Sequence, residues 1–158
     1  NQLSKAKKNM LDKEIDNLFL IPSFITRKAD HVLQNLRNQP NSIDQFKEIR
    51  DIAEEFILSD EERESHLQEK FHASVRDSWK IKRNMSKVMN GELNDKYEYI
   101  NNSIPNNWIR LLGAGAGGYF LVSIKDDISN PEELMVSKGI LDFIKASKSE
   151  VGLTSCEL

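Results

Sequence analysis

The stretch that decides the fold is residues 108–124, WIRLLGAGAGGYFLVSI. It holds four of the seven glycines in the chain, all between positions 113 and 118. Apolar residues flank the glycines on both sides, so we expect strands over residues 108–112 and 119–124. A glycine-rich loop would join them as a hairpin, which is typical of an antiparallel sheet.

The glycine loop contains a GxGxxG pattern, which in dinucleotide-binding proteins stands between a strand and a helix. Here a second strand is expected after Gly118, so that context is missing; a helix at this point would restore the dinucleotide interpretation. No Lys-Ser or Lys-Thr pair follows the glycines, which excludes a Walker A loop. Backbone N–H groups in a run of small residues can converge on an anionic oxygen. We interpret the run as a ligand-contacting loop, with a flexible hairpin loop as the alternative.

Upstream of the hairpin, the sequence predicts a connector and one strand. Residues 1–17 are Lys-rich with apolar residues at helical spacing, and we interpret them as a connector or marginal helix. Residues 18–24 are apolar and read as a strand, and Pro22 places it near a sheet edge or a strand end.

Helices are expected between this strand and the hairpin. The first begins at Thr26, and the second and third begin at Ser42 and Ser59, each of which starts a capping-box pattern. We expect the third helix to end at Asn90 and a short helix to cover residues 94–100. One apolar face is predicted for the second helix, lined by Phe46, Ile49, Ala53, Phe56 and Ile57.

Downstream of the hairpin, Asn130 and Pro131 begin another helix, as cap and first residue. Its apolar side is expected to reach Ile144, and residues 151–156 are expected to form a last strand. The order of elements is strand, three helices, two strands, helix, strand. It predicts an α+β fold, a small and mostly antiparallel sheet with helices packed on one face.

Composition and charge limit the function classes. The chain of 158 residues fits one domain, and 22 basic against 25 acidic residues give a net charge of -3, which argues against nucleic-acid binding. The longest apolar run, residues 18–21, is too short to span a bilayer. A single cysteine, Cys156, excludes an intrachain disulfide and a thiolate zinc cluster, and is typical of a reducing compartment. We therefore expect a cytoplasmic protein.

Basic residues gather on the third expected helix. Four cations share one helix face: Arg76, Lys80, Arg83 and Lys87. Lys82 lies on a different face of this helix. Such a stripe can bind phosphate, although a solvated helix face is the more common explanation. Thr26 and Arg27 stand at a helix start, where anions also bind, or Thr26 simply caps the helix with Arg27 exposed. The three histidines have no metal-ligand spacing and are expected at or near the surface: His31, His66 and His72.

Four segments together carry a resemblance to a known family. They are ITRKADHVL (25–33), SWKIKRNMS (78–86), NGELNDKY (90–97) and RLLGAGAGGYFL (110–121). In this order and at these distances they resemble the C-terminal half of a GHMP-superfamily sugar kinase. The branch they resemble most is the one that phosphorylates D-glycero-D-manno-heptose 7-phosphate and related sugars. The resemblance covers residues 18–158, which would form the kinase C-terminal domain.

This resemblance implies an ATP-dependent, two-lobed enzyme that transfers the γ-phosphate of ATP to a sugar hydroxyl. In that family the N-terminal lobe binds ATP and Mg²⁺ and carries the catalytic Asp, and none of its motifs occurs in these residues. No catalytic or metal residue is therefore expected here, and the chain alone is expected to be inactive. The resemblance implies that one loop faces the reaction centre: Gly113, Ala114, Gly115, Ala116, Gly117 and Gly118. It implies that five residues approach the sugar or its phosphate: Thr26, Arg27, Lys82, Arg83 and Arg110.

The sequence departs from the heptose-kinase pattern just before the loop. Two glycines and a lysine usually precede Leu-Leu-Gly, and here Trp108, Ile109 and Arg110 take their places. Bulky residues there would narrow the approach to the loop. The expected partners are a sugar or sugar-phosphate substrate and an N-terminal kinase lobe, without nucleic acid or membrane, and a homodimer stays open. The alternative function is a non-catalytic module, derived from such a kinase, that binds a sugar phosphate or a partner.

Overall fold

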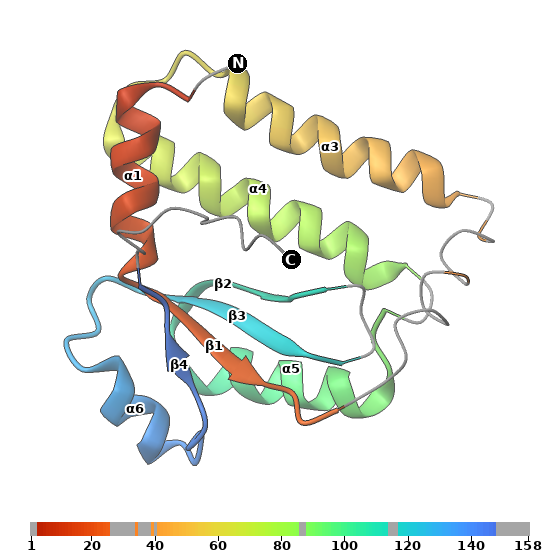
Figure 1. Ribbon diagram of the computed structural model, residues 1–158, viewed down its shortest axis with the longest axis vertical. Helices are drawn as coiled ribbons and strands as arrows, with labels where there is room; N and C mark the ends of the chain where they lie inside the picture. Colours follow the sequence, from red (N-terminus) through yellow and green to blue (C-terminus); the bar gives the residue numbers. More distant parts are fainter. Residues whose placement is uncertain are drawn as a thin grey trace, which may run out of the picture.

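The computed structural model describes residues 3–25, 34, 39, 41–85, 88–113 and 117–147. Its centre is a four-stranded antiparallel sheet in the order β2-β3-β1-β4 (Figure 1). The strands are β1 (Leu18–Pro22), β2 (Asn106–Leu111), β3 (Tyr119–Ile124) and β4 (Ile144–Lys145). The expected α+β class and its antiparallel sheet are confirmed, as is the β2–β3 hairpin.

Helices surround the sheet on more than one side. Those described are α1 (Lys5–Ile15), α3 (Ser42–Leu58), α4 (Glu64–Asn84), α5 (Gly91–Ser103) and α6 (Pro131–Ser137). Figure 1 shows α4 beyond the β2 side of the sheet with α3 outside it, while α5 and α6 lie on the opposite side. Across the described ranges, no helix combines the length and apolar character needed to cross a membrane.

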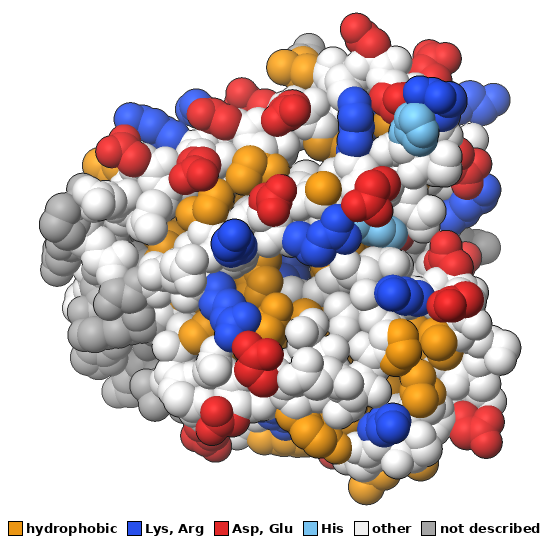
Figure 2. All heavy atoms as spheres, turned by 180° about the vertical axis from the view of Figure 1, so that it is seen from behind, with side chains coloured by type: hydrophobic (Ala, Val, Ile, Leu, Met, Phe, Trp, Pro, Cys, Tyr) orange, Lys and Arg blue, Asp and Glu red, His pale blue; other side chains and the backbone are white. Residues whose placement is uncertain are grey.

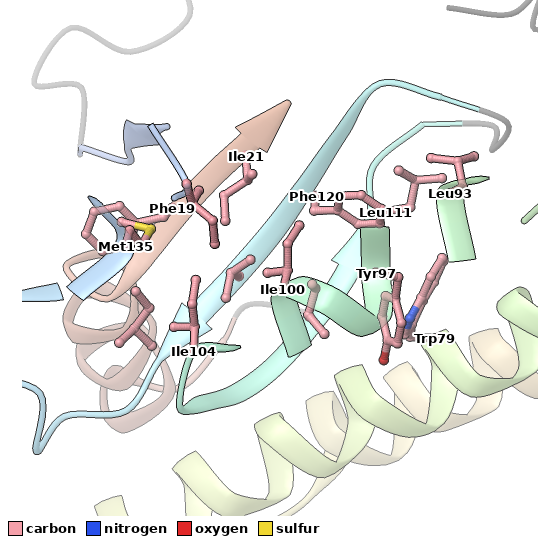
Figure 3. Packing of buried hydrophobic residues seen from close by; sticks show 14 of the residues in the cluster. Phe19, Ile21, Trp79, Leu93, Tyr97, Ile100, Ile104, Leu111, Phe120 and Met135 are labelled. Carbon is pink, nitrogen blue, oxygen red and sulfur yellow. The ribbon is translucent and has the colours of Figure 1, made fainter. Parts of the chain in front are cut away.

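The main core lies between the sheet and α5 (Figure 3). Alternate strand residues face it because side chains alternate across a sheet, so Phe120 and Val122 are fully buried while Leu121 between them is not. On α5, Leu93, Tyr97 and Ile100 recur at spacings of four and three residues and form one buried stripe. Trp79 of α4 packs against Tyr97 and joins α4 to this core.

A second, smaller cluster joins α1, α3 and α4 through Met10, Phe56 and Leu67. The apolar face expected on α3 is only partly covered, since Phe46 is 47% exposed and Ile57 is 40% exposed. The buried Lys7 of α1 closes the C-terminal end of α3, where its Nζ donates to the carbonyl oxygens of Ile57 and Ser59 at 2.7 and 2.6 Å.

Both predicted capping boxes are wrong. Ser42 is the first residue of α3, and its hydroxyl donates to the carbonyl of Gln39 instead of capping the helix. Ser59 ends α3, so α4 begins only at Glu64. The predicted end at Asn90 is also wrong, because α4 ends at Asn84 and Asn90 instead caps α5. Its side-chain oxygen accepts a hydrogen bond from the Leu93 N–H at 2.7 Å.

The expected start of the helix at Asn130 and Pro131 is confirmed, but its expected length is wrong. α6 ends at Ser137, and Gly139 follows with a φ of +73°, a conformation that favours glycine. The Gly139 and Ile140 N–H groups donate to the carbonyls of Val136 and Met135, which is the Schellman arrangement.

The chain then extends, and Ile144 and Lys145 pair with β1. Pro22 ends β1, as expected, but β1 is an interior strand between β3 and β4. The predicted helix from Thr26 and the predicted strand over residues 151–156 lie outside the described residues.

Candidate functional site

The glycine loop joins β2 to β3, and its two ends are fixed by backbone hydrogen bonds. The Leu112 N–H donates to the Tyr119 carbonyl at 2.8 Å, and the Ser23 N–H donates to the Gly118 carbonyl at 2.8 Å. Gly113 and Gly118 have φ values of +84° and +107°, which residues with a Cβ rarely adopt. Ala114, Gly115 and Ala116 lie outside the described residues.

Lys82 extends from α4 to the start of this loop. Its Nζ donates to the Gly113 carbonyl oxygen at 2.6 Å. The side chain is half-buried and forms no ion pair among the described residues. Within the described ranges, a cation therefore lies beside the glycine loop without a carboxylate to neutralise it.

Arg110 lies on β2, directly before the loop. Its neighbours Ile109 and Leu111 point into the main core, so Arg110 points to the opposite face of the sheet. It is half-buried, and its buried Nε has no hydrogen-bond partner among the described residues. Buried donors usually have an acceptor, so this guanidinium retains capacity for one.

Burial perturbs the acidity of both cations. Loss of hydration lowers the pKa of Lys82, and repulsion from the nearby Arg110 charge lowers it further. Burial also lowers the pKa of Arg110. An anionic group bound between them would offset both the lost hydration and the mutual repulsion.

Both side chains line one cavity of about 420 Å³, which we call the loop-side cavity. The described residues around it are Leu3, Leu11, Ile49, Ala53, Phe56, Ile57, Phe71, Ser74, Val75, Ser78, Lys82 and Arg110. No carboxylate is among these residues, and most of them are apolar. The cavity is thus a mostly apolar hollow in which an anion could contact two cations.

Arg83 does not join Lys82 and Arg110. One Nη donates to Asn94 Oδ1 and Glu98 Oε1, both at 2.6 Å, and the guanidinium lies 4.2 Å from the centre of the Tyr97 ring. These contacts hold it against α5, on the other flank of α4. Of the sequence-predicted site residues, the structure therefore brings together Lys82, Arg110 and Gly113. Thr26 and Arg27 lie outside the described residues.

Sequence reasoning missed Phe24 and Lys96 at the other end of the loop. Phe24 has a φ of +58°, unusual for a residue with a Cβ, and its side chain is 71% exposed. The Lys96 Nζ lies 4.4 Å from the centre of its ring and donates to the Ser23 carbonyl at 3.3 Å. Burial lowers the pKa of Lys96. The positive φ of Phe24 leaves no signal in the sequence. Lys96, in contrast, belongs to the NGELNDKY segment and could have been considered as a candidate site residue.

A buried polar network lies behind the site. Glu14 Oε1 accepts from the Trp108 indole at 3.1 Å and from the Ser123 hydroxyl at 2.6 Å, while Glu14 Oε2 lies 2.9 Å from His72 Nε2. His72 is 4% exposed, so its expected surface position is wrong, because Glu14 supplies a buried polar partner. The bulk of Trp108 and Ile109 is buried within the fold instead of projecting into the loop.

Comparisons with known proteins agree with this fold. No protein-family model and no curated protein matches the sequence. Solved structures do match, among them two mevalonate kinases. One aligns with a TM-score of 0.64 and 16% identity, over 91% of this chain and 42% of that chain. The other, from Methanococcus jannaschii, aligns with a TM-score of 0.64 and 14% identity, over 94% of this chain and 44% of that chain.

The chain therefore has the fold of part of a mevalonate kinase, a member of the GHMP superfamily, and spans less than half the length of these kinases. This agrees with the fold expected from the sequence, a GHMP kinase C-terminal domain.

Proposed function

We propose that this chain is the C-terminal, substrate-side half of an ATP-dependent GHMP-type kinase. In this proposal the γ-phosphate of ATP is transferred to a hydroxyl of a sugar or sugar phosphate in the cytoplasm. The observation that carries it is the placement of Lys82 and Arg110, two partly dehydrated cations without carboxylate partners, beside the glycine loop. The mevalonate kinase fold of the chain supports it.

Phosphoryl transfer requires mainly positioning of the reactants and stabilisation of negative charge. Lys82 and Arg110 would hold an anionic group of the acceptor substrate, and Lys82 would also fix the start of the loop through the Gly113 carbonyl. The apolar walls of the loop-side cavity would exclude water from this group, which strengthens its interaction with both cations.

ATP and Mg²⁺ would be bound mainly by an N-terminal lobe. Among the residues that the structure describes, no group of three or more His, Cys, Asp or Glu could hold a metal ion. In this proposal the chain contributes substrate contacts, and the metal ligands belong to the N-terminal lobe. The branch specific for heptose phosphate is the finer hypothesis, supported by the SWKIKRNMS segment that carries Lys82.

An ADP-release assay tests this function. The 158 residues alone, given MgATP and a panel of sugars and sugar phosphates including heptose 7-phosphate, are expected to show no substrate-dependent turnover. Addition of an N-terminal kinase lobe is expected to produce turnover. Lys82→Ala should then lower kcat/KM by about 100-fold, because a partly dehydrated cation facing the substrate is lost. The matched control is Lys70→Ala, an exposed lysine on the same helix, with no expected effect.

Substrate-dependent turnover by the chain alone would overturn the proposal. So would unchanged kinetics in both Lys82→Ala and Arg110→Ala. Calorimetry separates the alternative function, since a non-catalytic module would bind a sugar phosphate with the same affinity whether or not the N-terminal lobe is present.

A further inference from the structure

The opposite flank of α4 carries a second cavity, of about 540 Å³, between α4, α5 and β2. We call it the amide cavity because five asparagines line it: Asn84, Asn94, Asn101, Asn106 and Asn107. Three cations line it as well: Arg76, Lys80 and Arg83. Figure 2 shows this face, where Lys and Arg side chains gather around a hydrophobic patch between α4 and α5.

Positive charge is in excess in this cavity. Arg76 pairs with Glu69 at 2.7 Å, and Arg83 pairs with Glu98 at 2.6 Å. Lys80 makes no hydrogen bond or ion pair with the residues that the structure describes, and no carboxylate is among the described lining. Three cations against two carboxylates leave one positive charge, located on the exposed Lys80 ammonium. Such a charge favours an anion.

The asparagines retain hydrogen-bonding groups of both kinds. Asn94 uses its oxygen for Arg83, and its NH₂ group has no partner among the described residues. Asn106 and Asn107 use their NH₂ groups for neighbouring oxygens, and their side-chain oxygens have no donor in the described part of the chain. A cavity lined by both donors and acceptors complements hydroxyl groups, which can both donate and accept.

Aromatic side chains complete the wall. Trp79, Tyr97 and Trp108 all line the cavity. Trp79 is 3% exposed, and its indole N–H has no acceptor among the described residues. A buried donor without an acceptor is uncommon and calls for an explanation. The volume lies within the range of about 300–1,000 Å³ typical of small-molecule sites.

We propose that the amide cavity binds a soluble phosphate monoester of a polyol, with the phosphate at Lys80 and the hydroxyls at the asparagines. This site is separate from the loop-side cavity, because α4 lies between them and Lys80 and Lys82 project from different faces of that helix. Binding at this site requires no kinase activity, so the test of this site is independent of the test of the proposed function.

NMR of the two tryptophan indole N–H groups tests this site directly, because both tryptophans of the chain line the cavity. D-Glucose 6-phosphate is expected to shift the Trp79 indole signal saturably. D-Glucose and inorganic phosphate, which each supply half of the ligand chemistry, should bind at least about tenfold more weakly. Lys80→Gln should weaken binding of glucose 6-phosphate by at least about tenfold, through loss of one charged hydrogen bond.

Two further variants locate the binding. Lys70→Gln, an exposed lysine on the same helix, should leave the affinity unchanged. Lys82→Gln in the loop-side cavity should weaken the Trp79 response less than Lys80→Gln does. The proposal is overturned if no probe gives a saturable shift. It is also overturned if Lys82→Gln abolishes binding while Lys80→Gln does not, or if inorganic phosphate binds as tightly as the ester. The protein could instead co-sediment with phosphatidylcholine vesicles that contain phosphatidylinositol 4-phosphate, and lose this binding in Lys80→Gln. That result would overturn the soluble ligand in favour of a lipid headgroup.

Discussion

The two flanks of α4 carry cations in opposite environments. On the flank facing the glycine loop, Lys82 and Arg110 lie among mostly apolar side chains, and no carboxylate is among the described residues of that cavity. On the flank facing α5, Arg76 and Arg83 each pair with a glutamate, and Asn94 and Tyr97 add contacts to Arg83. Among the described residues, the first pair has only the hydrogen bond from Lys82 to the Gly113 carbonyl to offset its lost hydration, whereas the second is stabilised by ion pairs within the folded chain.

The paired cations are expected to contribute to stability, and the unpaired cations to ligand binding. Ion pairs that are satisfied within the protein have little left to offer a ligand, while unpaired and partly buried cations oppose folding until an anion arrives. In our proposal the loop-side cavity is a preorganised anion site. In the amide cavity, Lys80, which has no partner among the described residues, and the asparagine amide groups would supply the binding capacity.

The largest expected effect comes from Glu14→Ala, which removes the buried carboxylate that contacts His72 of α4, Trp108 of β2 and Ser123 of β3. Three buried polar groups lose their acceptor or partner, so the free energy of unfolding should fall by about 3 kcal/mol or more. Urea unfolding followed by tryptophan fluorescence measures it. Glu48→Ala, at an exposed position on α3, should change it by less than about 0.5 kcal/mol. Equal values for the two variants would show that the network does not hold α4 on the sheet.

A smaller loss is expected for Arg83→Ala on the paired flank. It removes two charge-assisted hydrogen bonds and the contact with Tyr97, which together should lower the free energy of unfolding by about 1–2 kcal/mol. Arg50→Ala on α3 is the matched control, because its ion pairs are exposed to solvent and should lower the free energy of unfolding less than the contacts of Arg83 do. Urea midpoints of the two variants decide whether the two environments differ.

The smallest effect, and the opposite sign, is expected for Lys82→Met. Burial lowers the pKa of Lys82 in the folded chain. At a pH between this lowered pKa and the ordinary value near 10.4, Lys82 is protonated in the unfolded chain but has released its proton in the folded chain. The free energy of unfolding of the unmodified protein therefore gains a rising contribution with pH through this window.

In Lys82→Met that rise is lost, and at neutral pH the free energy of unfolding should stay the same or increase by up to about 1 kcal/mol. Urea unfolding between about pH 7 and pH 10 measures both effects, with Lys70→Met as the control. A clear loss of stability at neutral pH would mean that the hydrogen bond from Lys82 to the Gly113 carbonyl outweighs the dehydration of the ammonium.

The parts of the fold that were predictable from sequence are local. The β2–β3 hairpin was predictable because apolar strands and glycines are contiguous, and the start of α6 was predictable because Asn130 and Pro131 act within one turn. β4 was not predictable, because two residues form it and its partner β1 lies more than 100 residues earlier. The serines at positions 42 and 59 matched a pattern that the chain does not use, since helix ends depend on tertiary contacts such as those of Lys7.

The candidate site divides in the same way. Helical spacing correctly placed Arg76, Lys80 and Arg83 on one face of α4 and Lys82 on another, which the two cavities confirm. Helical spacing could not show which cations are neutralised. The carboxylate that pairs with Arg83 is Glu98 of α5, and the charge that repels Lys82 is Arg110 of β2, so both come from other elements. The burial of His72 was equally inaccessible, since its partner Glu14 lies 58 positions away in sequence.

The depressed pKa of Lys82 has a chemical consequence. An amine that releases its proton more readily is a better nucleophile at moderate pH, so Lys82 should react with acylating reagents faster than an exposed lysine such as Lys70, provided that the reagent enters the cavity. An anion bound beside it would restore the proton and block the reagent. Competitive acylation read by mass spectrometry would therefore report whether an anion occupies the loop-side cavity.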